Sequence, residues 1–243
     1  MFEIRYYAQT ESTNDDAVPL LGLPENAGAV LWADYQRAGH GRRGRSWVAP
    51  AGSSLLVTTI LPRAVASESL WAVPFWTALG VAGGIEAATG LHLDLQWPND
   101  LLLEGRKCCG ILCVSRVVGE RAWVGCGTGI NVLRPPGNAD LAGVDPPPAF
   151  LSDRAPTVQR RDVLDAILAA YERLLGELDR PEAIARAWER RAGLDGTPYR
   201  LLVDGDEAPF EATARRLSPD GALIVERDGA ERRVALADAR VAR

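Results

Sequence analysis

Residues 34–47, Asp-Tyr-Gln-Arg-Ala-Gly-His-Gly-Arg-Arg-Gly-Arg-Ser-Trp, combine four arginines with three glycines and end on an aromatic residue. Glycines let backbone N–H groups approach a ligand closely, and guanidinium groups bind phosphate or carboxylate oxygens through paired hydrogen bonds. The tryptophan offers a flat face for a base, or an apolar wall. The same composition also fits a solvated loop or a nucleic-acid patch, and charge alone favours that simpler interpretation.

Four further segments carry unusual polar or glycine content beside predicted strands. They are residues 12–14, 96–100, 106–110 and 127–131. They add hydroxyl and amide groups, one lysine and an aspartate, but no His–Cys–Asp cluster for a metal cage or a nucleophilic triad. We therefore predict no protein-held metal. Many cations without a nucleophile suit a site that binds anions and stabilises charge developing at phosphorus.

Taken in order, these segments resemble the motifs of the biotin–protein ligases. Gly39-His-Gly-Arg-Arg-Gly-Arg-Ser-Trp47 is similar to that family's Gly-Arg-Gly-Arg-Arg-Gly-Arg-x-Trp loop, and Gln96-Trp-Pro-Asn-Asp100 to its Lys-Trp-Pro-Asn-Asp motif. The remaining three resemble Lys-x-x-Gly-Ile-Leu, Gly-x-Gly-Ile-Asn and Ser-Thr-Asn, and here they read Lys107-Cys-Cys-Gly-Ile-Leu112, Gly127-Thr-Gly-Ile-Asn131 and Ser12-Thr13-Asn14. Five motifs in family order make a specific match.

The resemblance implies an ATP-dependent ligase that works in two steps. The biotin carboxylate attacks the α-phosphate of ATP, supplied with Mg²⁺, to give biotinyl-5′-AMP and pyrophosphate. A lysine of a biotin carboxyl carrier protein then takes the biotinyl group and releases AMP. The chain reaches Ser12 almost at once. We therefore expect the monofunctional type, without the N-terminal DNA-binding domain of repressor-type members.

Three residues take catalytic roles if the resemblance holds. Arg42 and Lys107 match family residues at the junction of carboxylate and phosphate, and Asp100 would orient or deprotonate the incoming amine. From the residues alone, a solvated loop arginine, a hairpin-turn lysine and a structural turn aspartate remain open alternatives.

The implied biotin site provides hydrogen-bond partners for a buried ureido ring, whose desolvation would otherwise be uncompensated. Its residues are Ser12, Thr13, Asn14, Gln36, Gly39, His40, Gly41, Arg42, Lys107 and Gly110. Helix capping is the alternative for Ser12 and Thr13. The implied ATP site consists of Arg42, Arg45, Trp47, Asn99, Lys107 and Asn131, with Trp47 against adenine.

Two positions depart from the family pattern. His40 stands where an arginine is usual, and Gln96 where a lysine is usual. Both exchanges remove a permanent positive charge, since histidine is mostly neutral at physiological pH. We therefore expect a weaker hold on ATP or adenylate than in members that carry both cations.

Two other functions remain alternatives. A lipoate–protein ligase shares the fold and the adenylate chemistry, although the arginine loop and Trp-Pro-Asn-Asp favour biotin. A non-catalytic biotin-binding relative could also keep the fold, with His40 and Gln96 as signs of decay. The retained Arg42 and Lys107 argue against that second alternative.

The elements that must position these residues predict an α+β fold. We expect strands at 3–8, 29–35, 53–61, 93–97, 101–103, 107–115 and 122–126, and helices at 15–21, 67–89, 157–178 and 181–191. This pattern suits a mixed β-sheet with flanking helices, the class II synthetase-like fold of biotin and lipoate ligases. The proline-rich stretch 134–156 reads as a surface connection.

The predicted secondary structure changes from helices to short strands near residue 192. Short alternating strands at 199–203, 210–217, 222–226 and 232–235 follow, separated by Asp-Gly and Pro-Asp-Gly turns. We predict a catalytic domain at 1–191 and a small SH3-like β-barrel at 192–243.

Composition describes a globular protein, with 47% hydrophobic residues, 24% charged residues and a net charge of −5. The negative charge argues against generic nucleic-acid binding. We expect no apolar run long enough to span a membrane, no signal peptide, and no disulfide framework among the four cysteines. We therefore expect a cytoplasmic protein with reduced cysteines and no membrane partner. A homodimer through an exposed sheet edge remains possible.

Overall fold

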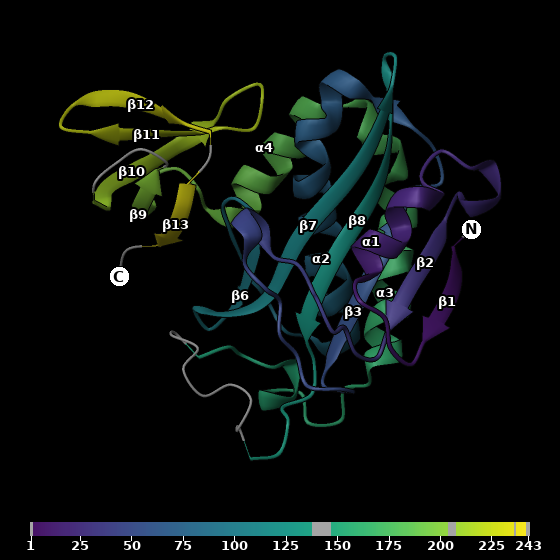
Figure 1. Ribbon diagram of the computed structural model, residues 1–243. Coiled ribbons are helices and arrows are strands. Elements are labelled where there is room, and N and C mark those ends of the chain that lie inside the picture. The colour runs from purple at the N-terminus through teal and green to yellow at the C-terminus, as the bar shows by residue number, and fades with distance from the viewer. Residues whose placement is uncertain (1, 138–146, 204–207, 236, 242–243) are drawn as a thin grey trace.

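Two β-sheets organise the chain in the computed structural model, which describes residues 2–137, 147–203, 208–235 and 237–241. The strands of an eight-stranded sheet lie within residues 3–131. A five-stranded sheet, whose strands lie within residues 198–241, stands beside it (Figure 1). The larger sheet has the order β1-β2-β3-β8-β7-β6-β5, with β4 paired to β8. β1 and β2 are parallel, and the other neighbours are antiparallel. The mixed sheet predicted from the sequence is confirmed.

The strands of the larger sheet follow the predicted segments closely. They are β1 (Glu3–Tyr7), β2 (Ala29–Ala33), β3 (Ser54–Ile60), β4 (Val65–Ala66), β5 (Asp94–Gln96), β6 (Asp100–Leu103), β7 (Arg106–Val118) and β8 (Arg121–Asn131). All of β3 is buried, which explains its run of leucine, valine, threonine and isoleucine.

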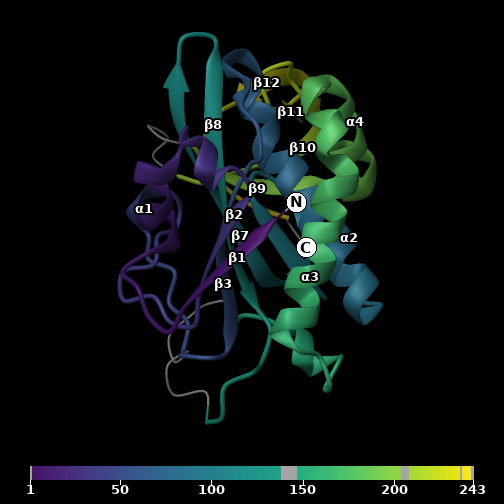
Figure 2. The ribbon, with the colours of Figure 1, turned by 90° about the vertical axis from the view of Figure 1, so that its right-hand side faces the viewer.

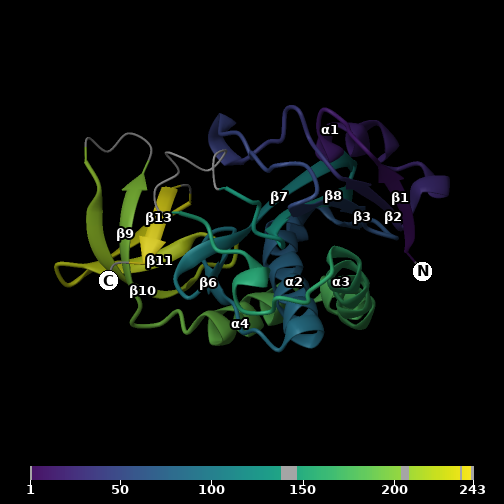
Figure 3. The same cartoon turned by 90° about the horizontal axis from the view of Figure 1, so that it is seen from below.

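Helices cover one face of this sheet. They are α2 (Val73–Thr89), α3 (Arg160–Leu174) and α4 (Pro181–Ala192). The short α1 (Thr13–Ala17) lies on the opposite face, as Figure 2 shows. Viewed from below, the same division leaves the α1 side of β7 and β8 without a covering layer of long helices (Figure 3). The α1 face, which lacks long helices, is therefore where a ligand can reach the sheet.

Two glycines let α2 and α3 pack closely. A Cβ added to Gly80 would lie 2.4 Å from the Tyr171 ring, and one added to Gly84 would lie 2.5 Å from the Ile167 Cα. The spacing of four residues puts both glycines on one face of α2. Trp76, stacked on Tyr171 with ring centroids 4.7 Å apart, continues the contact.

Two of the predicted helices begin later in the structure than the sequence suggested. The segment predicted as one helix from residue 67 begins as a 3₁₀ turn, Ser67–Ala72, and becomes α-helical only at Val73. Pro74 lies in the first turn of α2, where proline fits without losing a hydrogen bond. Likewise α3 begins at Arg160, three residues after the predicted start, with Gln159 in the N-cap position.

The Gly127–Asn131 motif was expected to follow a strand that ends at Cys126. It is instead the last part of β8, where residues 127–131 pair with β3 and residues 127–130 also pair with β7. Glycine has low strand propensity, which is why the sequence suggested a loop. The glycines leave the open face of β8 without side chains at Gly127 and Gly129.

The second sheet has the order β12-β11-β10-β9-β13. Its strands are β9 (Pro198–Val203), β10 (Phe210–Leu217), β11 (Leu223–Arg227), β12 (Ala230–Val234) and β13 (Ala237–Val241). Four of the five were predicted, and β13 was missed. Among the described residues β12 and β13 do not pair, so the small β domain is present but the predicted closure into a barrel is not seen.

Two further expectations can be checked. All four cysteines are free, and burial raises the pKa of the Cys108 thiol to about 12. Contrary to expectation, residues 67–89 are long and apolar enough to cross a membrane by length and composition. The most apolar 18-residue window of this segment is 61% buried inside the protein, as in a core helix. The predicted connection at 134–156 lies partly outside the described residues.

Candidate active site

A cavity of about 750 Å³ opens on the α1 face of the larger sheet. It collects residues from all five sequence motifs. Of the predicted site residues it is lined by Ser12, Thr13, Asn14, Gln36, His40, Gly41, Arg42, Arg45, Trp47, Asn99, Asp100, Lys107, Gly110 and Asn131. Gly39 does not line the cavity. It is buried, and a Cβ there would lie 2.6 Å from the Trp47 carbonyl oxygen.

One end of the cavity is a buried network of neutral polar groups. The Gln36 Oε1 accepts hydrogen bonds from the Thr13 N–H at 2.7 Å and from the Thr13 hydroxyl at 2.9 Å. The Thr58 hydroxyl lies 2.9 Å from Thr13 Oγ1 and 2.8 Å from Asn14 Oδ1. Asn14 in turn donates to the Leu112 carbonyl at 3.0 Å. This end presents fixed hydroxyl and amide groups without formal charge.

The hydroxyl groups of the Ser-Thr-Asn motif do not cap α1. Ser12 occupies the N-cap position, but no side-chain capping bond forms there. The Thr13 hydroxyl points to Gln36 instead. The capping alternative considered for both residues is therefore not what the structure contains.

Trp47 lies flat against the two central strands. Gly110 of β7 and Gly129 of β8 are directly paired. A Cβ on either would lie within 2.8 Å of the indole ring. Among the described residues, the buried indole N–H has no hydrogen-bond partner. The glycine pair thus forms a seat for the ring, and the ring leaves one donor unused.

Charged groups meet at the centre of the cavity. Lys107 Nζ lies 2.7 Å from Asp100 Oδ1 and 5.6 Å from the Trp47 ring centroid. Arg42 donates to the Asn99 side-chain oxygen at 3.2 Å, while Asn99 donates to the Ile111 carbonyl at 2.9 Å. Two cationic side chains from distant parts of the chain therefore flank one region, which favours an anion between them.

The arginine loop closes on itself above this region. The Gly41 N–H donates to the Arg45 carbonyl at 2.6 Å, and the Trp47 N–H donates to the Gly39 carbonyl at 2.8 Å. Arg43 takes a left-handed conformation, with φ 59°. His40, 48% exposed in its side chain, places Nε2 2.8 Å from an Asp15 carboxylate oxygen. The loop is thus a defined turn that points His40 towards α1.

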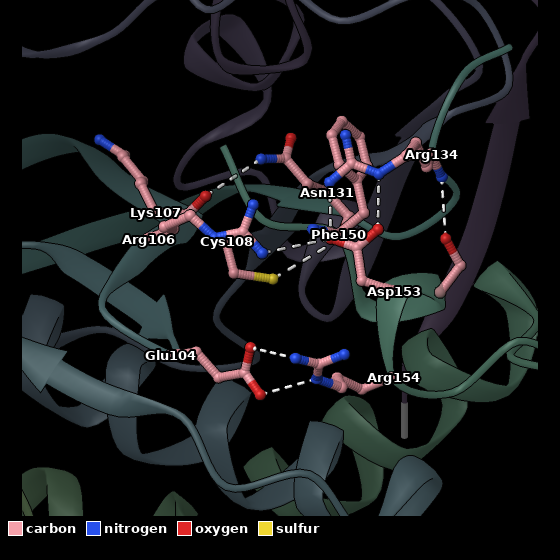
Figure 4. Close-up of polar contacts among 10 residues, drawn as sticks. Glu104, Arg106, Lys107, Cys108, Asn131, Arg134, Phe150, Asp153 and Arg154 are labelled. Carbon is pink, nitrogen blue, oxygen red and sulfur yellow. Dashed lines mark hydrogen bonds and ion pairs between the residues drawn. The ribbon is translucent and has the colours of Figure 1, made fainter. Parts of the chain in front are cut away.

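A second cluster supports the strand ends from behind (Figure 4). Asp153 accepts two hydrogen bonds of 2.6 Å from the Arg134 guanidinium and one of 3.0 Å from the Phe150 N–H. The Arg134 hydrogen bonds hold the pKa of Asp153 below its usual value. The Asn131 amide lies 3.5 Å from the Lys107 carbonyl, which also accepts from the Ala149 N–H. Two predicted site residues are therefore anchored together.

Several residues of the site were missed by sequence reasoning. Thr58 lies in the middle of a uniformly buried strand, where nothing in the pattern singles it out. Gly129 belongs to a quoted motif, and its glycine alternation could have suggested a seat for a ring. Ala239 and Val241 line the cavity from the second sheet. No sequence signal indicated that the C-terminal strand would reach the site.

The fold and site define a class: an α+β protein whose mixed sheet carries a cavity with a neutral polar end and a cationic centre. The profile described as "Biotin/lipoate A/B protein ligase family" matches residues 6–131. The chain is 34% identical to the biotin–[acetyl-CoA-carboxylase] ligase of Paracoccus denitrificans over 228 residues, covering 90% of this chain and 92% of that one. This protein therefore belongs to the biotin/lipoate A/B protein ligase family.

Two other comparisons agree with this assignment. The biotin–[acetyl-CoA-carboxylase] ligase of Mycobacterium tuberculosis is 28% identical over 234 residues, or 91% of this chain and 82% of that one. The biotin protein ligase of Aquifex aeolicus, solved with biotin and ATP, superposes with a TM-score of 0.74 at 21% identity. That superposition covers 98% of this chain and 99% of the other, so the whole described fold is shared.

Proposed function

We propose that this protein is a biotin–protein ligase that makes biotinyl-5′-AMP from biotin and ATP and transfers biotin to a lysine of a carrier protein. The observation that carries the proposal is one cavity with two chemically different parts. Its neutral polar end matches a ureido ring, which needs both donors and acceptors. Its cationic centre matches a carboxylate facing a phosphate, and Trp47 offers a flat face for adenine.

In the first step the biotin carboxylate attacks the α-phosphorus and pyrophosphate leaves. Two anions must approach each other, so Arg42 and Lys107 neutralise charge at the point of contact. Asn99 holds Arg42 by its side-chain oxygen, and Asp100 holds Lys107. Mg²⁺ enters with ATP as part of the substrate. Arg45, Trp47 and Asn131 serve the nucleotide.

In the second step a carrier lysine attacks the carbonyl of the mixed anhydride, an amide forms, and AMP leaves. The amine must lose a proton, and the carboxylate of Asp100 lines the cavity. Asp100 already pairs with Lys107, so the incoming amine would replace Lys107 beside this carboxylate. The glycine-rich loop, with Gly39, His40 and Gly41, covers the adenylate and limits hydrolysis.

Biotin is favoured over lipoate by the polar end of the cavity. A dithiolane ring has no N–H or carbonyl group, so it could not exchange hydrogen bonds with the polar groups of Ser12, Thr13 and Gln36 that line this end. We expect Thr58→Val to weaken biotin binding about tenfold, because it deletes one hydroxyl of the network. Binding of an ATP analogue to the biotin-free protein should not change. Calorimetric titration with each ligand measures both.

The decisive assay mixes the purified protein with ATP, Mg²⁺, biotin and the biotin carboxyl carrier domain of acetyl-CoA carboxylase. We expect one biotin on one carrier lysine, detected by mass spectrometry. Pyrophosphate exchange with lipoate in place of biotin separates the lipoate alternative. Biotin binding without pyrophosphate exchange would show a non-catalytic relative and refute the proposal.

We further propose that residues 1–191 form the ligase domain and residues 192–243 a small β domain, and that the protein acts in the cytoplasm. α4 ends at Ala192, followed by a left-handed Gly193, and the second sheet begins at Pro198. A homodimer through β1 also belongs to the proposal. β1 pairs with β2 on one side, and on its other side the described part of the chain places no strand.

A further inference from the structure

Gln96 joins the edges of the two sheets. It is the last residue of β5, the edge strand of the larger sheet, and it is 8% exposed. Its Nε2 donates to the Ala239 carbonyl at 3.2 Å, and its Oε1 accepts from the Val241 N–H at 3.2 Å. Both partners belong to β13, the edge strand of the second sheet. One side-chain amide thus acts as a rung between two sheets.

The strand held in this way is part of the cavity wall. Ala239, Val241 and Gln96 line the same cavity as Asn99 and Lys107. In the larger sheet, Gln96 pairs with Asp100 across β5 and β6. The polar end includes Thr58 of β3, and β8 and β7 lie between β3 and the β6–β5 pair in the strand order. β13 therefore borders the cationic side of the cavity.

The next residue strengthens the same joint. The Trp97 backbone N–H donates to the Tyr199 hydroxyl, and its indole N–H donates to the Gly221 carbonyl, both at 3.2 Å. These contacts hold the body of the second sheet, whereas the Gln96 contacts reach β13 itself. A lysine, which is usual here in the resembling family, could donate to Ala239 but could not accept from Val241.

We propose that Gln96 is a positioning residue that fixes β13 as a wall at the nucleotide end of the cavity. The identity of the ligand rests on the proposed function, whereas the placement of β13 does not. In this arrangement the side chain at residue 96 carries no charge, and its amide holds β13 in place through two hydrogen bonds. Val241 is a suitable second site for a test, because its N–H points to Gln96 and away from the pairing with β9.

The test begins with Gln96→Met, which keeps the length of the side chain and removes both hydrogen bonds. We expect affinity for a non-hydrolysable ATP analogue, measured with biotin bound, to fall about five- to tenfold. Biotin affinity should stay within about twofold, since the polar network is untouched. Amide hydrogen exchange in peptides covering 237–241 should become faster. Gln159→Met, at an exposed helix cap outside the cavity, is the matched control.

A double-mutant cycle separates positioning from direct ligand contact. Val241→Pro removes the N–H that Gln96 accepts, and proline is tolerated on an edge strand. If Gln96 acts through β13, the double variant should bind the ATP analogue no more weakly than the worse single variant. Additive losses would overturn the positioning role. So would unaltered exchange at 237–241 in Gln96→Met, whatever ligand the cavity binds. Failure of the wild type to label the carrier would refute the proposed function alone.

Discussion

Trp47 illustrates how single residues decide the chemistry of this cavity. Its ring fits only because Gly110 and Gly129 face each other on paired strands and present no side chain. Its N–H is buried and has no partner in the described structure, so a nucleotide could supply an acceptor. The value of the glycines is therefore the space that they leave for an aromatic ring.

Gly129→Ala tests this seat. The new Cβ would lie 2.5 Å from Trp47 Cε2, so the indole must move. We expect affinity for the ATP analogue to fall about five- to 150-fold, from a repacking cost of about 1–3 kcal/mol, while biotin affinity changes little. Calorimetry provides both constants. If the effect acts through the ring, Gly129→Ala should add little in a Trp47→Ala background, and a full additional loss would contradict the explanation.

His40→Arg tests the departure from the family pattern. The residue lines the cavity and faces Asp15 at 2.8 Å, so an arginine there has a carboxylate to hold it near the loop. We expect ATP affinity to rise a few-fold, because a permanent charge is added. His92→Arg adds the same charge beside Glu86, away from the cavity, and serves as the control. Unchanged nucleotide affinity in His40→Arg would argue against our placement of His40.

At the scale of elements, close packing of α2 on α3 supports the larger sheet from the face opposite the cavity. Gly84→Ala would place a Cβ 2.5 Å from the Ile167 backbone, whereas Gly83→Ala meets nothing within 4 Å. We expect the first to destabilise the fold by about 1–3 kcal/mol. The second should stabilise it by about 0.5–1 kcal/mol through helix propensity. Urea unfolding of both variants is the measurement, and equal effects would contradict the packing argument.

The Asp153 cluster makes the strand ends sensitive to acid. Its pKa is lowered chiefly by the Arg134 hydrogen bonds, so the ionised form stabilises the fold above the unfolded pKa, near 4. That contribution is lost as the pH falls through the lowered folded value. We expect Asp153→Asn to cost about 2 kcal/mol at pH 7 and progressively less below pH 4. Urea unfolding across this pH range provides the comparison.

The control for this experiment is Asp165→Asn, which breaks an exposed i,i+4 pair with Arg161. It should change stability little at any of these pH values. A difference between wild type and Asp153→Asn that does not shrink in acid would show that the Arg134 pair contributes nothing that depends on ionisation.

At the scale of the whole molecule, the two edge strands of the larger sheet, β5 and β1, have different neighbours. The β5 edge is met by β13 through Gln96, while β1 presents its outer side beside an exposed Tyr6. We expect a homodimer through β1, and we expect Tyr6→Lys to shift it towards monomer because lysine disfavours edge pairing. Analytical ultracentrifugation measures the shift. Val118→Lys, at an exposed hairpin end, is the control, and an equal shift in both variants would exclude the β1 edge.

The sequence alone predicts the fold class, most of the strands and fifteen site residues, of which fourteen line the cavity. It could do so because hydrophobic periodicity is local and because the motifs carry residues whose chemistry is specific. Gly39 does not line the cavity, and its motif cannot distinguish a glycine that touches the ligand from one that lets the loop pack.

How these residues are arranged and used depends on contacts that form only in the folded chain. Thr58 joins the polar end because β3 lies beside α1, and Gly127–Asn131 works as a strand because β3 and β7 pair with it on both sides. In the sequence, Gln96 was notable only because it replaces a lysine that is usual in the family. In the structure its amide holds β13, which lies more than 140 residues later in the chain. Such contacts depend on which chain segments meet in space, and no local pattern of residues encodes that meeting.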